Sequence, residues 1–368
     1  MKIRNIHVFN VAVKLKKPLR IAKMVRERGS STIVKVETDE GIHGFGEATF
    51  AHFFAGETQD SAQSVVNRFL APALMGEDPT NILSLVDQMN TAIAGNPFAK
   101  AAVEMALWDI KGKVLQTPVY QLLGGYRRLI IPVNQSVSYG STSEMVEETL
   151  HHVSRGFKTI KVYCGRETPR DDLERIQQIR KAVGDGIQIY VESNQRWSFK
   201  TVLWLLPYFE ELRVLFMEQP ISIHLRREMK VLREKSSIPI AIDESVFSAE
   251  DVVRAKQDEI ADIMNIYVLK AGGILNAKRA LDVTESVGLA AFIGSFNELG
   301  ISSAAGAHLS ATLLSLPYPC YLVGPTLYEE EILMEPLDIR EGFFYLSDRP
   351  GLGIEVDEKQ LIKFSVAS

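Results

Sequence analysis

The chain has 368 residues, of which 46% are hydrophobic and 24% charged, so it can bury a large core and shows no compositional sign of disorder. Its 41 basic and 46 acidic residues give a net charge of −5, and the basic residues are scattered, which argues against nucleic acid as a partner. Two cysteines cannot build a disulfide framework, and no apolar stretch reaches the roughly 18 residues of a membrane span, so we expect a cytoplasmic protein with no membrane partner.

The N-terminal part of the chain predicts three antiparallel strands followed by helices. Alternating polar and apolar side chains, the two-residue period of a half-buried strand, occur at residues 3–13, 31–38 and 42–47. From residue 59 to residue 115 the period becomes helical, and Leu122-Leu123-Gly124-Gly125 has the small residues that end a helix. We therefore expect an α+β domain over residues 1–125.

The rest of the chain alternates short apolar runs with helical segments. The runs lie at residues 130–136, 159–163, 187–192, 214–218, 239–243, 263–268, 290–294 and 321–323. Strands that are apolar on both faces and alternate with helices indicate a parallel sheet, and so many regular units favour a closed (β/α)₇β barrel of the TIM type over residues 126–330. A doubly wound open sheet is the alternative, and the absence of a G-x-G-x-x-G motif weakens it. We expect residues 331–368 to form short strands that pack back on the first domain.

Acidic residues end three consecutive strands of this series. The strands finish at Glu192, Glu218 and Asp243. Because all strands of such a barrel point the same way, the three carboxylates should meet at its C-terminal mouth, where they repel one another unless a cation neutralises them. Oxygen ligands from separate strands suit Mg²⁺, with Mn²⁺ as an alternative, whereas Zn²⁺ would call for His or Cys. Each acidic residue taken alone could equally cap a helix; the near-constant spacing of all three favours the metal site.

Lysines end the strands on either side of this set. Lys161 and Tyr163 should share the inward face of one strand, and Lys270 should enter the mouth from the opposite wall. A lysine that is partly desolvated near a cation can act as a base near neutral pH. The Gly272-Gly273 pair after Lys270 leaves space for a ligand, which favours a catalytic role over a surface lysine.

At this point the chain resembles the enolase superfamily, and within it the muconate lactonizing (muconate cycloisomerase) branch. The resemblance covers nearly the whole length and rests on Gly44-Phe45-Gly46-Glu47-Ala48, residues 104–109, residues 122–125, Val191-Glu192-Ser193-Asn194-Gln195, Met217-Glu218-Gln219-Pro220, Ile242-Asp243-Glu244-Ser245, Lys270-Ala271-Gly272-Gly273, Glu298 with His308, and Val323-Gly324-Pro325. It implies a capping domain over the barrel and a Mg²⁺ site made by the three carboxylates. It also implies that Asn194 and Glu244 support this site, and that Glu298 hydrogen-bonds near a substrate carboxylate.

This resemblance implies Mg²⁺-dependent abstraction of the α-proton of a small-molecule carboxylate, with Lys270 as the base, Lys161 as a stabilising ammonium, and a homo-oligomer as the assembly. The branch normally has Lys-x-Lys where this chain has Lys161-Val162-Tyr163, so a base on one face of the substrate is replaced by a phenol. We therefore expect a cycloisomerase first, with an amino-acid or dipeptide racemase and a β-hydroxy-acid dehydratase as alternatives. Tyr163 is either an acid/base or a residue that only positions substrate.

Two readings from other classes stay open. A non-catalytic binding protein could keep the metal site and lack the second base, and a metal-dependent hydrolase could use the same barrel, although the missing His ligands argue against it. Because the cap should exclude water and select the substrate, we expect the segments 18–31 and 50–59 to be loops that set specificity.

Overall fold

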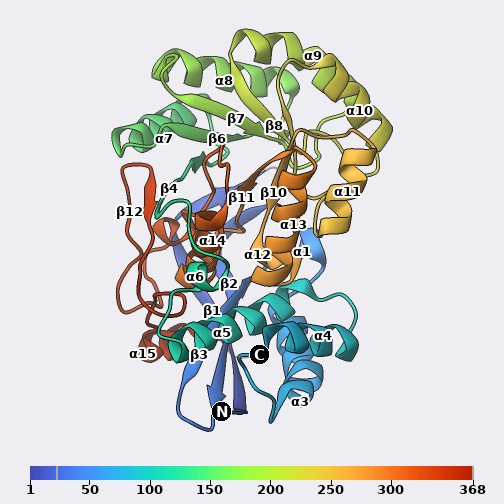
Figure 1. The fold of residues 1–368 in the computed structure, drawn as a ribbon. Helices are drawn as coiled ribbons and strands as arrows, with labels where there is room; N and C mark the ends of the chain where they lie inside the picture. Colours follow the sequence, from blue (N-terminus) through green and yellow to red (C-terminus); the bar gives the residue numbers. More distant parts are fainter. Residues whose placement is uncertain (22–23, 367–368) are drawn as a thin grey trace.

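The computed structural model describes residues 1–21 and 24–366. The N-terminal part is a three-stranded antiparallel sheet in the order β1 (Ile3–Arg20), β2 (Val25–Thr38) and β3 (His43–Thr49), as the sequence predicts (Figure 1). Its helical segments are α1 (His52–Ala55), α2 (Gln59–Val65), a π-helical turn (Val66–Leu70), α3 (Ala71–Leu74), α4 (Ile82–Ala92), α5 (Pro97–Val114) and α6 (Val119–Leu122).

Glycines of β3 let helix α5 lie directly on this sheet. A Cβ atom on Gly46 would stand 1.8 Å from the carbonyl oxygen of Ala102, and one on Gly44 would stand 2.2 Å from that of Ala106. No side chain fits such a gap, so the Gly-x-Gly pattern is required for this packing. The small residues of α5 are in turn buried on nearly every side.

The second part of the molecule is a curled parallel sheet with helices on its outside. Its seven strands are β5 (Gln135–Val137), β6 (Thr159–Tyr163), β7 (Gln188–Glu192), β8 (Val214–Glu218), β9 (Ile240–Ile242), β10 (Ile263–Ile266) and β11 (Ala290–Ile293), paired in chain order. The helices are α7 (Thr142–Ser154), α8 (Pro169–Val183), α9 (Phe199–Glu211), α10 (Arg226–Lys235), α11 (Ala249–Gln257), α12 (Val268–Ala271), α13 (Ile274–Ser286) and α14 (Gly300–Thr312).

A short extended segment joins the two edges of the parallel sheet. The N–H of Tyr321 donates to the carbonyl of Ile293 on β11, and Cys320 exchanges hydrogen bonds with Pro132 and Asn134 next to β5. This segment takes the eighth strand position of the barrel, so the predicted (β/α)₇β barrel is confirmed. It pairs through these few bonds and is not the regular strand expected at 321–323.

Other local expectations also differ from the structure. The stretch 130–136 is split: β4 (Ile130–Pro132) leaves the barrel to pair with β13 (Phe343–Tyr345) and, through it, β12 (Ile339–Arg340). The run 263–268 ends as a strand at Ile266, and its last residues enter the one-turn helix α12. The C-terminal stretch also contains a helix, α15 (Glu358–Phe364), whose neighbour Ser365 pairs with Val11 of β1.

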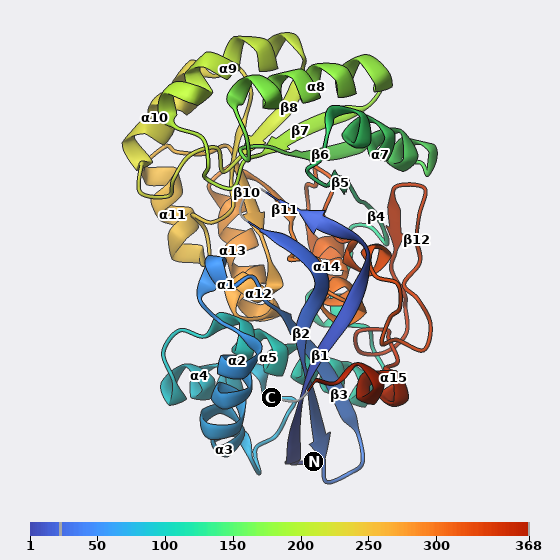
Figure 2. The ribbon, with the colours of Figure 1, turned by 180° about the vertical axis from the view of Figure 1, so that it is seen from behind.

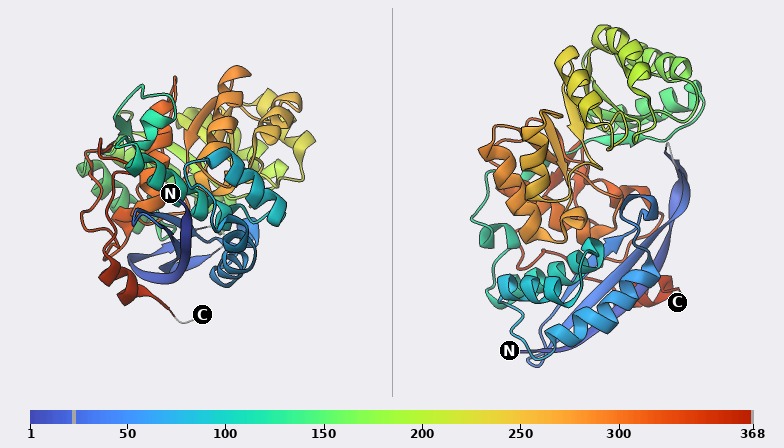
Figure 3. Two further views of the ribbon diagram at one scale, coloured as in Figure 1. Left: turned by 60° about the horizontal axis from the view of Figure 1, so that its bottom comes forward. Right: turned by 90° about the vertical axis from the view of Figure 1, so that its right-hand side faces the viewer.

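The β1–β2 hairpin is much longer than predicted and reaches from the first sheet to the barrel. Figure 2 and the right-hand view of Figure 3 show the paired strands running past the barrel toward the loops after β5 and β6. Most of the segment 18–31 is therefore strand, and not the loop we expected; residues 22 and 23 lie outside the described residues. The N–H of Arg20 donates to Ser138 at 2.8 Å and Arg166 donates to the carbonyl of Ile21 at 3.0 Å, so the barrel holds the far end of the hairpin.

None of the helices in residues 1–21 and 24–366 combines the length and the apolar character that crossing a bilayer demands.

Candidate active site

The three strand-end carboxylates meet at one place in the barrel. Glu192 ends β7, Glu218 ends β8 and Asp243 directly follows β9. One oxygen of each lies within 4.8 Å of the others, and their exposed fractions are 0%, 0% and 2%. Parallel strands bring their ends to one edge, and the register pairs Glu192 directly with Glu218, so the sequence spacing alone produces this cluster.

The backbone turns sharply after these strands. Asn194 has a φ of 46° and Gln219 a φ of 34°, a region that non-glycine residues rarely adopt. The turn lets the Asn194 N–H donate to Glu192 Oε1 at 2.6 Å, while Gln219 Oε1 accepts the N–H of Asp243 at 3.1 Å. The strained residues therefore hold the Glu192 carboxylate and the backbone of Asp243 in place.

Burial dominates the electrostatics of this cluster. Loss of water raises the pKa of Glu192 well above its ordinary value, and the neighbouring Glu218 raises it further. Burial also raises the pKa of Asp243, although Lys270 opposes the shift. Burial therefore favours the neutral forms of Glu192 and Asp243, and nearby positive charge favours their ionised forms.

Two lysine ammonium groups flank the cluster, one at each end. Lys161, on β6, places Nζ 3.3 Å from Glu192 Oε2 and 3.0 Å from Glu218 Oε2. Lys270 places Nζ 2.5 Å from Asp243 Oδ1 and also donates to the carbonyl oxygens of Asp243 and Asn265, at 2.8 and 2.7 Å. Lys270 stands on the helical turn α12 and not at a strand end, yet the structure brings both predicted lysines to the carboxylates.

Tyr163 lies beside Lys161, as the alternation of β6 predicts. The Lys161 Nζ is 5.2 Å from the Tyr163 ring, and the rings of Tyr321 and Tyr190 lie at 5.4 and 5.8 Å. Burial raises the pKa of the Tyr163 phenol well above its ordinary value, while Lys161 lowers it. The ammonium is thus enclosed by carboxylates and aromatic faces.

The carboxylate cluster has the chemistry of a divalent cation site. Glu192 Oε2 and Glu218 Oε2 are buried and accept no hydrogen bond of normal geometry within residues 1–21 and 24–366, although the Lys161 ammonium stands close to both. Buried carboxylate oxygens that accept no hydrogen bond destabilise the folded protein unless a cation binds them. The donor set is made only of oxygens, which fits Mg²⁺ or Mn²⁺.

The remaining predicted residues lie near this cluster but not all within it. Asn194 lines the same small pocket, and the buried Glu244 stands next to Asp243 and raises the pKa of Glu192. Glu298 lies in the loop between β11 and α14, where Ser295 Oγ and the N–H of Phe296 donate to it. Burial raises the pKa of Glu298 to about 7.

Sequence reasoning missed two residues that orient the carboxylates. Asn265 Nδ2 donates to Glu218 Oε1 at 2.6 Å, and the Tyr267 hydroxyl donates to Asp243 Oδ2 at 2.9 Å. Both occur at alternate positions of the apolar run 263–268. That alternation of polar side chains within an otherwise apolar run was the signal that could have identified them.

The pocket next to the carboxylates is small and has apolar walls. Its volume is about 50 Å³, and the barrel contributes Tyr163, Tyr267 and Phe296. The N-terminal part contributes Leu19, Ile21, Met24, Arg26, Ala51 and Phe54. The Phe54 ring packs edge-on against Phe296 at 4.8 Å, and both segments 18–31 and 50–59 line the pocket, although 50–59 contains the helical turn α1 and is not wholly the loop we expected.

A barrel with a buried carboxylate cluster at its mouth, two flanking lysines and a second domain over the opening defines a class of enzymes that act on small carboxylates with a divalent cation. Comparison with known proteins supports this assignment to a class of enzymes. Residues 3–124 match the family described as mandelate racemase / muconate lactonizing enzyme, N-terminal domain, and residues 144–360 match the enolase C-terminal domain-like family.

Similar proteins cover the whole chain. An N-succinyl-L-Arg/Lys racemase of Bacillus cereus is 34% identical over 367 residues, which is 100% of this chain and 98% of the relative. A chloromuconate cycloisomerase of Cupriavidus necator is 30% identical over 371 residues, covering 100% of both chains. The crystal structure of muconate lactonizing enzyme from Pseudomonas fluorescens complexed with muconolactone superposes with a TM-score of 0.97 at 31% identity, covering 99% of both chains.

The chain belongs to the mandelate racemase/muconate lactonizing enzyme family of the enolase superfamily, in its muconate lactonizing branch. It is therefore an enzyme of a superfamily whose shared mechanism is Mg²⁺-dependent abstraction of a proton next to a carboxylate. Membership in this family excludes the two other hypotheses, a binding protein without activity and a metal-dependent hydrolase.

Proposed function

We propose that Glu192, Glu218 and Asp243 hold Mg²⁺, with Mn²⁺ as a substitute, and that Lys270 removes the α-proton of a bound carboxylic acid. The observation that carries this proposal is the contact of Lys270 Nζ with Asp243 at one end of the carboxylate cluster while Lys161 contacts Glu192 and Glu218 at the other. When bound, the cation supplies positive charge beside the substrate carboxylate, which makes the neighbouring proton more acidic.

Lys270 is placed to act as a base. Its amine lies 4.3 Å from the centre of the Tyr267 ring and 5.7 Å from that of Phe54, so water has little access to it. Its Nζ contacts Asp243, so the amine lies at the edge of the proposed cation site. The neutral amine is the form that accepts a proton.

Lys161 has the complementary role of a permanent positive charge. Burial alone would lower its pKa, but Glu218, Tyr163 and Glu192 outweigh this effect and raise the pKa well above its ordinary value. An ammonium that stays protonated stabilises the negative charge that develops on the substrate carboxylate when the α-proton leaves. Asn194 and Glu244 support the carboxylate cluster, and Glu298 hydrogen-bonds near the substrate carboxylate.

Within this class we rank cycloisomerisation first. It needs an acid/base on only one face of the substrate, and the lysine expected on the other face is Tyr163 here. Racemisation or epimerisation of an amino acid or dipeptide is the second candidate, and its support is the 34% identity to a racemase that acts on N-succinyl amino acids. Dehydration of a β-hydroxy acid is the third.

The pocket composition supports a substrate with a second acidic or polar group. Arg26 reaches the pocket from β2 and donates through Nη1 to the Phe296 carbonyl at 3.1 Å. Its Nη2 is buried and has no hydrogen-bond partner among the described residues. A buried guanidinium donor of this kind is satisfied by a carboxylate or carbonyl oxygen of the ligand.

We also propose the organisation in which this chemistry takes place. Residues 1–125 form the cap, 126–330 the barrel, and 331–368 a C-terminal segment that returns to the cap, where Glu358 pairs with Lys35. The two free, buried cysteines suit the cytoplasm, and the assembly is a homo-oligomer.

The direct experiment is exchange of the α-proton in D₂O with Mg²⁺ present, followed by NMR over a panel of amino acids, dipeptides, N-succinyl amino acids, hydroxyproline-like acids and muconate-like acids. The wild-type protein should exchange at least one of them, and Lys270→Ala should not. Lys278→Ala, which removes a half-buried lysine of α13 that pairs with Asp282, is the matched control and should exchange normally. Normal exchange by Lys270→Ala, confirmed as folded by its thermal melt, would refute the assignment of the base.

A further inference from the structure

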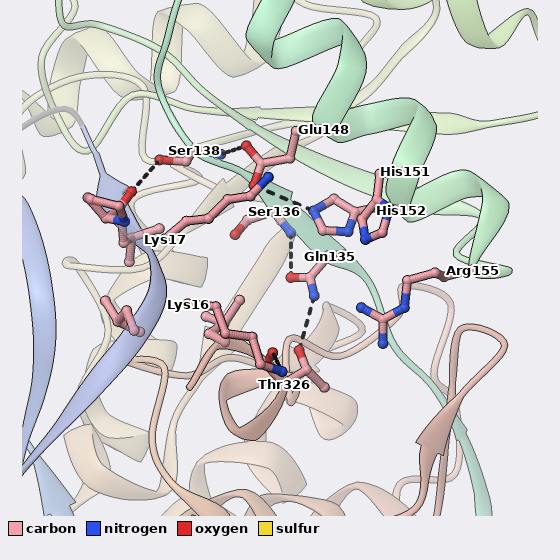
Figure 4. A pocket seen from close by; sticks show the side chains of 14 residues that line it. Lys16, Lys17, Gln135, Ser136, Ser138, Glu148, His151, His152, Arg155 and Thr326 are labelled. Atoms are coloured by element: carbon pink, nitrogen blue, oxygen red, sulfur yellow. Dashed lines mark hydrogen bonds and ion pairs between the residues drawn. The ribbon is translucent and has the colours of Figure 1, made fainter. Parts of the chain in front are cut away.

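A second pocket lies beneath strand β1, separate from the pocket beside the carboxylates. Its volume is about 120 Å³, and four elements line it: β1, β5, α7 and the 3₁₀ turn Gly324–Leu327. Figure 4 shows side chains from β1 and α7 pointing toward each other across this space. We call this second pocket the lateral pocket. Leu19 lines both pockets, so only a thin wall separates the lateral pocket from the active site.

Positive charge dominates the lining of the lateral pocket. Lys16, Lys17 and Arg155 face a single carboxylate, that of Glu148. Lys16 Nζ donates to the carbonyl of Thr326 at 2.9 Å. Lys17 lies close enough to Glu148 to lower the pKa of that carboxyl, but neither Lys17 nor Arg155 comes within 4.0 Å of a carboxylate in residues 1–21 and 24–366. In a chain whose net charge is −5, a pocket with this balance is suited to an anionic ligand.

A buried histidine supplies a polar group with no adequate partner. His152 is 6% exposed, and neither ring nitrogen makes a hydrogen bond of normal geometry within the described residues; Glu148 Oε1 is 3.8 Å from Nε2. Burial lowers its pKa to about 4, helped by His151 and Arg155 and opposed by the Ser136 backbone. The Ser136 backbone and the Glu148 carboxylate stand near the ring without making a hydrogen bond of normal geometry, so the second ring nitrogen is left for a ligand in the pocket.

The lateral pocket is connected to the active site through one hydroxyl. Ser136 lines the pocket from β5, and its Oγ is 2.7 Å from the Tyr321 hydroxyl. The Tyr321 ring is one of the three that enclose the Lys161 ammonium, at 5.4 Å. A ligand in the pocket would therefore contact the β1–β2 hairpin on one side and a neighbour of Lys161 on the other.

We propose that the lateral pocket is a binding site for a small anion, a carboxylate or phosphate group held by Lys17, Arg155 and the His152 imidazole. The volume corresponds to about four water molecules at roughly 30 Å³ each, which is enough for such a group. The anion is either the far end of the substrate, reaching past Leu19, or a separate metabolite. Binding itself requires no catalysis, so the site stands apart from the proposed reaction.

The test is calorimetric titration of the full chain with inorganic phosphate and with succinate, in EDTA and again in Mg²⁺. We expect one site per chain in both conditions, and affinity at least tenfold weaker in Lys17→Met/Arg155→Met. The matched control, Lys181→Met/Lys200→Met, removes the same charge from the outer helices α8 and α9 and should bind as the wild type does. His152→Phe should weaken binding at least threefold while it keeps the ring packing.

Two results would overturn the proposal: equal affinity in all of these proteins, or an anion site that is lost with the active-site variant Lys161→Met and kept in Lys17→Met/Arg155→Met. The source of the anion is read from the exchange assay with its best substrate. If phosphate raises the KM for the substrate, and Lys17→Met/Arg155→Met raises it equally, the pocket binds the distal group of the substrate. An unchanged KM with saturable phosphate binding identifies a separate anion; both results support the site.

Discussion

The Glu104 carboxylate on cap helix α5 accepts a 2.8 Å hydrogen bond from the backbone N–H of Ile274 at the start of barrel helix α13. A second bond, 2.9 Å from the N–H of Leu275, makes the carboxylate a cap for this helix supplied from elsewhere in the chain. Gly273 has a φ of 131°, and a Cβ there would lie 2.6 Å from the Glu104 carboxyl, so only glycine permits the contact. The bond fixes the end of the turn that carries Lys270.

Glu47 makes the same kind of bridge to the loop that carries Glu298. The N–H groups of Leu299 and Ser302, at the start of α14, donate to it at 2.7 and 3.0 Å. The two cap carboxylates therefore attach the cap to the segments that bear two of the proposed active-site residues. Cap and barrel position the site together.

We expect Glu104→Ala to loosen the Lys270 turn. Loss of three hydrogen bonds, from the backbone N–H groups of Ile274 and Leu275 and from the Trp108 indole, should destabilise the protein by about 2–4 kcal/mol. The α-proton exchange rate should fall at least tenfold, and amide hydrogen exchange over residues 268–275 should rise. Glu104→Gln should restore much of the stability, and Asp87→Asn, an exposed residue of the same domain, is the control. Unchanged amide protection in Glu104→Ala would show that the cap does not order this turn.

Metal binding should depend on Glu218 and on pH. Glu218→Gln removes one ligand charge, so we expect affinity for Mn²⁺ to fall at least 100-fold, whereas exposed Glu174→Gln should change nothing. Because burial raises the pKa of Glu192 and Asp243, the cation must displace protons, and its affinity should fall as the pH is lowered from 8 to 6. Mn²⁺ titration followed by electron paramagnetic resonance at both pH values measures these effects. Affinity independent of both changes would place the metal elsewhere.

Tyr163 decides between reactions that use one face of the substrate and those that use two. If Lys270 is the only base, the wild-type protein should exchange the α-proton of one enantiomer without inverting it, and Tyr163→Phe should keep this exchange within about tenfold. Tyr163→Lys restores the Lys-x-Lys pattern and should gain inversion. Chiral analysis of the substrate recovered from D₂O gives the answer. Inversion by the wild type that disappears in Tyr163→Phe would make the phenol the second acid/base and the protein a racemase or epimerase.

The positions of the three carboxylates could be predicted because they follow from local rules. Strand ends are visible as the last residue of an apolar run, and parallel strands place these ends together without any knowledge of distant contacts. The same rule brought Lys161 and Tyr163 to the correct face. Lys270 reached the expected place by a different route, since the chain leaves the strand at Ile266 and turns once as a helix.

Other features depend on contacts that sequence patterns do not carry. Glu104 is 170 residues away from the N–H group it caps, and nothing local distinguishes it from any other glutamate of an apolar helix. The length of the β1–β2 hairpin was missed because Lys17 and Pro18 interrupt the alternation of β1, whose pairing is itself irregular between Lys14 and Leu19. There the barrel and the opposite strand hold an extended backbone that the side-chain pattern does not predict.

Glu298 should make the metal-free protein less stable as the pH rises. Its carboxyl is 3% exposed, and burial raises its pKa to about 7 from an ordinary value of 4.5. Below pH 4.5 the group is protonated in both the folded and the unfolded chain and has no effect. Between pH 4.5 and 7 the unfolded chain releases the proton that the folded chain keeps, so each pH unit lowers the free energy of unfolding by up to about 1.4 kcal/mol. Above pH 7 the full loss, up to about 3 kcal/mol, is reached.

Glu298→Gln removes this titration. Urea unfolding in EDTA at pH 5, 6, 7 and 8 should therefore show a variant whose stability relative to the wild type increases steadily up to pH 7 and then levels off. Glu335→Gln, at a carboxylate that is 73% exposed, should follow the wild-type curve throughout. Parallel curves for Glu298→Gln and the wild type would mean that the Glu298 carboxyl ionises at its ordinary pH in the folded protein, in which case Ser295 and the Phe296 N–H stabilise the charged form enough to offset its burial.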